Sequence, residues 1–211
     1  FGCKRLVSST GYYETFNRGN VTLVDVSGAG RIERLTRTGL VAGGREYPLD
    51  ALVLATGFDA MTGSITRIRI TGRGGITIQE SWRDGPGNFL GLAVQGFPNM
   101  FNMAGPGGPS VLANMVAMGE HAAEWIAGCI AWMRDQHRTR IEARQAAQTA
   151  WGEEVAEASK GSLRSICNSW YVGSNVPGKP RVFMPYIAGY PKYDAVCRKV
   201  AANGYEGFEA G

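Results

Sequence analysis

The first part of the chain shows the short apolar runs and alternations that are typical of strands. Residues 21–26 form an apolar run of the kind that makes a buried strand. Residues 31–54 alternate apolar segments with glycine turns, which predicts a small meander. Its last segment, residues 51–54, is expected to be a second buried strand.

Three further segments are expected to be extended. Residues 65–70 and 76–78 alternate apolar and polar side chains on either side of a glycine turn, which predicts an antiparallel hairpin with one face in water. Residues 100–104 have the composition of another buried strand, and residues 182–184 form a short apolar strand late in the chain.

The second half of the chain has helical periodicity. After Ser110, a good N-cap, apolar residues recur every three or four positions, which predicts a long amphipathic helix that ends near Arg134. A second helix, interrupted by Gly152, is expected at residues 142–159, and a last helix near residues 193–203. Strands and helices together predict an α/β fold in which a long helix follows a Gly-rich loop.

Composition and charge exclude several classes of protein. The 211 residues are 44% hydrophobic and 19% charged, which is typical of a globular chain and not of a disordered one. The net charge of +4 comes from scattered residues, so no nucleic-acid partner is expected. No apolar run approaches the roughly 18 residues of a membrane span, so no membrane partner is expected either.

Cysteine and histidine are the residues from which redox and metal sites are most often built. The chain has four cysteines: Cys3, Cys129, Cys167 and Cys197. They are far apart and show no CxxC or Cys/His ligand spacing, so we expect free thiols in a reducing, cytoplasmic compartment. His121 and His137 have no partner carboxylate or cysteine at ligand spacing, so no metal site is expected.

The Gly-rich loop at residues 105–110 is the sharpest local motif. Small residues before a helix N-terminus let an anion or an electron-rich ring edge approach the backbone. The loop is not a dinucleotide fingerprint, because Ser110 stands where GxGxxG has its third glycine. From the residues alone, cofactor contact and a purely structural turn remain equal alternatives.

Other motifs have ordinary structural explanations when taken alone. Thr56 and Gly57 end an expected strand, where ligands meet open α/β sheets, but such a pair is mostly a turn. Lys4 and Arg5 are a dibasic pair of the kind that usually lies in solvent. The five tryptophans are expected to be core or interface anchors: Trp82, Trp125, Trp132, Trp151 and Trp170.

Six segments together give the sequence a family resemblance. They are residues 11–18, 52–60, 96–101, 105–110, 168–170 and 175–179. In order and spacing, from Lys4 to Gly207, they resemble the C-terminal half of a flavin-dependent Baeyer-Villiger monooxygenase, of which cyclohexanone and phenylacetone monooxygenases are familiar members.

The resemblance implies a domain organisation. It places residues 1–57 as the C-terminal part of an NADPH-binding domain and residues 58–211 as the returning part of an FAD-binding domain. The fold is then part of a two-dinucleotide-binding-domain, Rossmann-like flavoprotein. Both glycine fingerprints and the family's FxGxxxHxxxW signature are absent. We therefore expect a C-terminal fragment, inactive by itself, whose partner is the N-terminal half of the same polypeptide.

The resemblance also implies a reaction. A monooxygenase of this family uses NADPH and FAD to insert one oxygen atom of O2 beside a ketone carbonyl, through a C4a-peroxyflavin, and gives an ester or lactone. Arg5 matches the active-site arginine, whose permanent charge suits an anionic nucleophile. Lys4 matches the lysine near the adenosine 2'-phosphate. Thr56 and Gly57 match the hinge strand end between the cofactors.

Further residues match the family's pocket and lid. Trp170 matches a tryptophan on a mobile loop that reaches bound NADP(H) and keeps water out. Three residues match the loop at the substrate pocket: Ser110, Val111 and Leu112. Asn114 and Met115 match positions against the pyrimidine edge of the flavin.

Two other functions are carried as alternatives. A flavin monooxygenase of the same superfold that hydroxylates nitrogen or oxidises sulfur is the closer one. The Lys4-Arg5 pair and residues 175–179 favour the ketone monooxygenase over it. A non-catalytic, stand-alone binding domain would explain the absent fingerprints, but we expect such a domain not to open at Phe1, inside an active-site motif.

Overall fold

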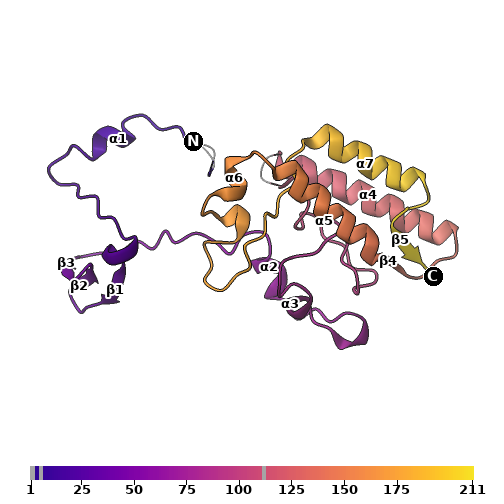
Figure 1. Cartoon of the computed structure of the whole chain (residues 1–211), viewed down its shortest axis with the longest axis horizontal. Coiled ribbons are helices and arrows are strands. Elements are labelled where there is room, and N and C mark those ends of the chain that lie inside the picture. Colours follow the sequence, from indigo (N-terminus) through magenta and orange to yellow (C-terminus); the bar gives the residue numbers. More distant parts are fainter. Residues whose placement is uncertain (1–2, 5–6, 111–112) are drawn as a thin grey trace. The chain divides into compact units, whose positions relative to one another are not determined.

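The computed structural model describes residues 3–4, 7–110 and 113–211. It contains two compact units, which are considered separately. The small unit is Leu6–Gly57, and the large unit combines Phe1–Arg5 with Phe58–Gly211. Figure 1 shows their elements.

The small unit contains a three-stranded antiparallel meander. Its elements are α1 (Tyr12–Thr15), the 3-10 turn η1 (Gly28–Gly30), β1 (Ile32–Leu35), β2 (Gly39–Ala42) and β3 (Arg45–Pro48). Ala42 pairs with Arg45 across a two-residue turn in which Gly43 and Gly44 both have positive φ. This is the backbone that a tight hairpin requires and that glycine adopts without strain. The predicted meander is confirmed at residues 32–48.

The two buried strands predicted in the small unit are not formed. Residues 21–26 and 51–54 are irregular, and the Val53 side chain is 87% exposed. A buried strand takes its hydrogen bonds and its apolar cover from neighbours. Among residues 7–110 and 113–211 the only sheets are β1-β2-β3 and a two-stranded β4-β5 pair, so neither segment has a neighbouring strand.

The large unit is mainly helical. Its helices are α2 (Gly63–Thr66), α3 (Ile78–Ser81), α4 (Met115–Asp135), α5 (Gln145–Ser159), α6 (Leu163–Ile166) and α7 (Tyr190–Ala202). Its 3-10 turns and strands are η2 (Arg73–Gly75), η4 (Trp170–Val172), β4 (Ile141–Ala143) and β5 (Phe208–Ala210). The three long helices α4, α5 and α7 run beside one another and share one core (Figure 1).

Aromatic side chains dominate that core. Trp125 of α4 donates its indole N–H to the Cys197 carbonyl of α7 at 3.0 Å. Trp151 of α5 stacks on Tyr186, with ring centroids 4.9 Å apart. The hydrogen bond satisfies the Trp125 indole N–H, which burial would otherwise leave unpaired. Trp82, Trp125 and Trp151 are buried, as predicted for core anchors.

The helix boundaries differ from the predicted ones. The long helix begins at Met115, because Asn114 is the N-cap and its Oδ1 accepts the N–H groups of Val116 and Ala117. Ser110 is not the cap, and its φ of 34° lies in the left-handed region, whereas an N-cap is extended. Helix α5 runs through Gly152 without interruption, since tertiary packing outweighs a glycine cost of about 1 kcal/mol.

The predicted hairpin is also wrong. One isolated bridge, Thr71 with Thr77, joins its two halves. Thr77 instead begins α3 through a capping box with Glu80, so the alternation at residues 76–78 marks a helix start. The strands predicted at residues 100–104 and 182–184 are irregular as well. Single hydrogen bonds, such as Met184 N–H to the Tyr171 carbonyl, take the place of a ladder.

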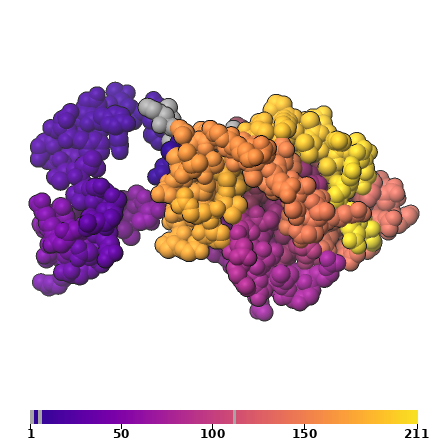
Figure 2. Space-filling model, viewed as in Figure 1, coloured from indigo at the N-terminus to yellow at the C-terminus, as the bar shows by residue number. Residues whose placement is uncertain are grey.

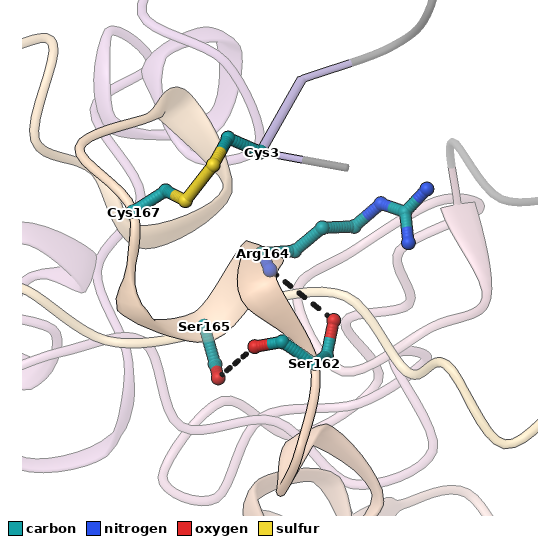
Figure 3. Close-up of a disulfide and its surroundings, with 5 residues drawn as sticks. All are labelled: Cys3, Ser162, Arg164, Ser165 and Cys167. Atoms are coloured by element: carbon teal, nitrogen blue, oxygen red, sulfur yellow. Dashed lines mark hydrogen bonds between the residues drawn. A yellow bond between two sulfur atoms is a disulfide. The ribbon is translucent and has the colours of Figure 1, made fainter. Parts of the chain in front are cut away.

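The expectation of four free thiols is wrong for one pair. Cys3 and Cys167 form a disulfide (Figure 3), because the fold brings their Cα atoms to 5.5 Å, a separation that a disulfide spans. Cys129 and Cys197 are free and buried. In the part of the chain that the structure describes, no helix is both long and apolar enough to cross a membrane.

Candidate functional site

Three hydrogen bonds join the Gly-rich loop to residues 184–186 and to Trp151. Gly107 N–H donates to the Met184 carbonyl at 2.7 Å, and the Gly108 carbonyl accepts the Tyr186 N–H at 2.9 Å. The Trp151 indole donates to the Gly107 carbonyl at 3.1 Å. The loop is therefore fixed by contacts within the large unit, and it carries the chain to Ser110 in one defined conformation.

Ser110 is the one predicted pocket residue whose surroundings are described. Its side chain is 3% exposed, and its Oγ has no hydrogen-bond partner among the described residues. A buried hydroxyl without a partner is uncommon and marks a place where a ligand or water atom fits. The other two predicted pocket residues, Val111 and Leu112, lie outside the described residues.

The start of α4 presents apolar side chains to solvent. Met115 and Val116 are exposed in its first turn, and Met103 is exposed before the Gly-rich loop. Asn114 is also on the surface, with its side-chain oxygen engaged in the N-cap. This exposed end of a 21-residue helix combines apolar contact area with a backbone dipole. It suits a flat ligand with a polar edge.

Thr56 and Gly57 end the small unit. Both are exposed, and Gly57 has φ of 82°, a conformation that most side chains resist. Glycine adopts this backbone conformation without strain. The two residues lie at the boundary that divides the units.

The disulfide brings two predicted site segments to one region of the large unit. Lys4 is exposed and follows Cys3 directly, while Trp170 lies three residues after Cys167. Arg5 lies outside the described residues. In Figure 3, Cys167 follows the α6 turn, which Ser162 caps by accepting the Arg164 N–H at 3.2 Å. Cys3 adjoins Lys4, and Cys167 is three residues from Trp170. This proximity is a sequence signal that could have suggested a Cys3–Cys167 pair.

Trp170 is half-buried and stacks on a fully buried neighbour. Its ring lies 4.1 Å from that of Tyr171, centroid to centroid, at an interplanar angle of 27°. The 3-10 turn Trp170–Val172 ends at Gly173, whose φ is 73°. Ser174 Oγ closes the turn by donating to the Ser169 carbonyl at 2.9 Å. Trp170 thus sits on a built turn with part of its ring exposed.

Residues 175–179 contact residues 58–60. The sequence identified residues 175–179 only as a family motif and did not predict these contacts. The Lys179 ammonium lies 2.5 Å from Asp59 Oδ1 and donates to the Ala60 carbonyl at 3.0 Å. Asn175 donates to the Phe58 carbonyl at 2.8 Å. The partners are 117 to 120 residues apart along the chain, so no local pattern could have paired them.

A cleft of about 300 Å3 lies beside this contact. Asp59 and Lys179 line it together with Thr62, Arg83 and Pro177. In Figure 2 orange surface from late in the chain adjoins magenta surface from its middle. The lining of the cleft combines charged side chains with three prolines, Pro86, Pro177 and Pro180.

His121 has a carboxylate neighbour that the sequence did not reveal. Its Nδ1 lies 3.5 Å from Asp194 Oδ1, because α4 and α7 pack together. Spacing along the chain could not reveal this carboxylate, because Asp194 lies on α7. The described residues contain no group of three or more His, Cys, Asp or Glu side chains arranged for a metal ion.

The two free cysteines are not candidates for reactive groups. Burial raises the pKa of the Cys129 thiol to about 12, and burial likewise raises the pKa of Cys197 to about 12. Only the thiolate is a nucleophile, so both thiols are inert at neutral pH. They belong to the core between α4 and α7.

Comparison with known proteins gives the site its context. The chain is 40% identical over 214 aligned residues to a 2-oxo-Δ3-4,5,5-trimethylcyclopentenylacetyl-CoA monooxygenase of Pseudomonas putida, and 41% identical over 210 to an acetone monooxygenase (methyl acetate-forming) of a Gordonia strain. It is 39% identical over 206 to a phenazine N-monooxygenase of Lysobacter antibioticus. These matches cover 97–99% of this chain but 38–39% of the relatives. No protein-family model matches the chain.

Solved structures agree with the sequence comparison. An oxidised steroid monooxygenase bound to NADP is 46% identical, with a TM-score of 0.84 over 99% of this chain and 38% of the other. A protein named OTEMO, in complex with FAD and NADP, is 40% identical, with a TM-score of 0.90 over 100% of this chain and 39% of the other.

The matched proteins share a class of fold and, within it, a family. The fold is that of one part of a two-dinucleotide-binding-domain flavoprotein monooxygenase, as predicted. Within that class, the relatives at 35–41% identity include cyclohexanone 1,2-monooxygenase, cyclopentanone 1,2-monooxygenase and a protein named Baeyer-Villiger monooxygenase. The resemblance to the Baeyer-Villiger monooxygenases is confirmed, over about 39% of their length.

Proposed function

We propose that this chain works as part of an NADPH- and FAD-dependent Baeyer-Villiger monooxygenase, which inserts one atom of O2 beside a ketone carbonyl to give an ester or lactone. The observation that carries the proposal is identity of 41% over 99% of the chain to a relative whose name states this chemistry, acetone to methyl acetate. We assign residues 1–57 to NADPH binding and residues 58–211 to FAD binding.

The large unit offers surfaces that fit a flavin. The exposed apolar side chains at the start of α4 suit the ring, and the buried, unpartnered Ser110 Oγ can pair with a polar atom of the flavin or of the ketone. Asn114 and Met115 would then lie at the pyrimidine edge. When bound, FAD reduced by NADPH supplies the electrons that activate O2.

The remaining proposed roles follow from charge and shape. Arg5, as a guanidinium, stays protonated at neutral pH and would stabilise negative charge at the reacting oxygen. Lys4 is exposed, and its ammonium would bind the 2'-phosphate of NADPH. Trp170 would cover the nicotinamide end and exclude water. Thr56 and Gly57 would form the hinge, and Val111 and Leu112 would line the ketone pocket with Ser110.

The test is made on the polypeptide that carries this chain together with the regions by which its relatives are longer. With NADPH and a panel of cyclic and methyl ketones under 18O2, we expect ketone-dependent NADPH oxidation and one labelled oxygen in the ester or lactone. A flavin-loaded protein that oxidises NADPH without labelling any ketone product would contradict the proposal.

A second candidate reaction is N-oxygenation. It is favoured by the 39% identity to a phenazine N-monooxygenase, which is as high as that to several ketone monooxygenases. The same 18O2 assay, run with phenazines and other aromatic N-heterocycles, separates the two. A labelled N-oxide formed faster than any ester at equal substrate concentration would replace the first candidate by the second.

A further inference from the structure

Residues 167–179 are bonded to the chain just before the small unit and just after it. Cys3 precedes the small unit, and Phe58 to Ala60 follow it. Cys3 is bonded to Cys167, and the residues after the small unit are bonded to Asn175 and Lys179. We name residues 167–179 the clamp segment. Trp170 lies inside it, between the two fastenings.

The second fastening has the geometry of a built contact. The side chains of Lys179 and Asp59 are 11% and 27% exposed, and the ammonium donates to both Asp59 Oδ1 and the Ala60 carbonyl. Asp59 is also packed closely, because a Cβ added at Gly63 would lie 2.6 Å from its Cβ and Cγ. The exposed pair Lys160 and Glu157 is a contrast, with side chains 71% and 65% exposed. Pairs of that kind contribute little.

Lys179 also supports the turn that carries Trp170. Gly173 ends that turn with φ of 73°, and a Cβ added there would lie 3.2 Å from the Lys179 Cγ and Cδ atoms. One side chain therefore touches two places: its aliphatic stem packs under Gly173, and its ammonium holds Asp59. Displacing Lys179 loosens the Trp170 turn and the residues after the small unit together.

We propose that Lys179 is a positioning residue, which fixes Trp170 relative to the point where the chain enters the large unit, Phe58 to Ala60. This inference rests on the proposed function, in which Trp170 keeps water from the reduced cofactor. With Trp170 loosely held, NADPH would be oxidised without oxygenation of a ketone: NADPH + H+ + O2 gives NADP+ + H2O2. Lys179 would thus raise the fraction of NADPH oxidation that is coupled to ester formation.

Two variants and a control separate this role from general stability. Lys179→Met keeps most of the stem and removes the charge and both hydrogen bonds, and Lys179→Arg restores a cation. Lys160→Met removes an exposed lysine of the large unit whose one ion-pair partner among the described residues is Glu157. The first readout needs no activity: amide hydrogen exchange in residues 169–174 and 58–60. The second is H2O2 released per NADPH in the FAD-loaded, full-length protein with ketone present.

We expect Lys179→Met to speed exchange in both segments by about ten-fold and to raise H2O2 per NADPH about five-fold, with flavin reduction by NADPH within about two-fold of the parent. Lys179→Arg should recover most of both effects, and Lys160→Met should match the parent. If Lys179→Met does not fold, Asp59→Asn tests the same contact with a smaller change in shape.

Three outcomes would overturn the inference or part of it. Unchanged exchange in Lys179→Met means that the contact does not hold the Trp170 turn. Faster exchange with unchanged H2O2 yield in an enzyme that oxygenates ketones means that the contact has no role in the reaction. A parent that oxygenates no ketone refutes the proposed function and with it the catalytic role of Lys179, while hydrogen exchange still decides whether the contact exists.

Discussion

The indole N–H of Trp151 donates to the carbonyl of Gly107, with 3.1 Å between nitrogen and oxygen. This bond joins helix α5 to the loop that leads to Ser110. The Gly107 Cα is also close to the indole, because a Cβ added there would lie 3.0 Å from the same nitrogen. Gly107 has φ of 85°, which residues other than glycine rarely adopt. The conformation of the loop therefore depends on both residues.

We expect Trp151→Phe to weaken the protein and the ketone pocket together. The change leaves the Gly107 carbonyl without its donor, which costs about 1–3 kcal/mol for a buried group, and removes part of the core. Denaturant unfolding and the KM for ketone measure the two effects. Trp132→Phe is the matched control, since Trp132 is partly buried against the same core but lies against Tyr205. A KM shift equal to that of the control would contradict the link to the loop.

Arg5→Ala is expected to abolish oxygenation in the complete enzyme and to leave flavin reduction by NADPH largely intact. The reductive step does not need a cation beside the reacting oxygen, whereas oxygen transfer does. Stopped-flow absorbance follows both steps in one experiment. Arg138→Ala, at an exposed position, is the control. Normal ester formation in Arg5→Ala would refute the assigned role.

Lys4→Ala should weaken NADPH selectively. A compact ammonium that binds the 2'-phosphate contributes nothing to NADH, which lacks that group. We expect the KM for NADPH to rise about ten-fold or more and the KM for NADH to change little. Lys160→Ala serves as the control. Equal changes for both cofactors would show that Lys4 is ordinary surface.

Thiol counting tests the cysteine assignments. In denaturant without reductant, we expect two reactive thiols, Cys129 and Cys197, and four after reduction. In the folded state both should resist alkylation at pH 8. Because burial raises each folded pKa to about 12 from 9.0, these neutral thiols stabilise the fold below pH 9, and that contribution is lost as pH rises from about 9 to 12. Cys129→Ala should flatten this alkaline loss; an unchanged slope would contradict it.

Residues 1–211, produced without further sequence, are expected to bind no FAD. The pyrophosphate of FAD needs a glycine turn at a helix N-terminus, and GxGxxG is absent. Leu52, Val53 and Leu54 are exposed in the small unit, and each such side chain left in water forgoes roughly 1.5–3 kcal/mol. FAD titration followed by gel filtration checks this. A yellow, monodisperse protein with one flavin per chain would show the expectation to be wrong.

The sequence predicted best those elements whose pattern is local. The meander, the long helix α4 and the buried tryptophans follow from periodicity and turn residues, which act over a few positions. The strands at residues 21–26 and 51–54 were wrongly predicted because apolar runs show a need for burial but not the neighbour that meets it. The predicted start of α4 is too early because Ser110 and Asn114 are both good N-cap residues, and the structure uses Asn114.

The candidate site shows the same division between local and distant information. Lys4, Trp170 and Ser110 were singled out from motifs, and their roles stay predictions. The contacts that arrange them were not predictable from the sequence alone. Cys3 meets Cys167 across 164 residues, and Asp59 meets Lys179 across 120. Such pairs are made by the tertiary fold, which no spacing rule encodes.

Strand β5 has a consequence for how the large unit forms during synthesis. Phe208 packs against Phe89 and Trp125, and β5 pairs with β4, so the core that starts at residue 89 is closed by residues 208–210. At about 5–20 residues per second, a ribosome needs several seconds or more to make the intervening chain. Until Phe208 has been made, Trp125 of α4 lacks the aromatic contact that Phe208 provides. The large unit must therefore complete its folding after residue 210 has left the ribosome, and chaperones that shield apolar helices would act on it before then.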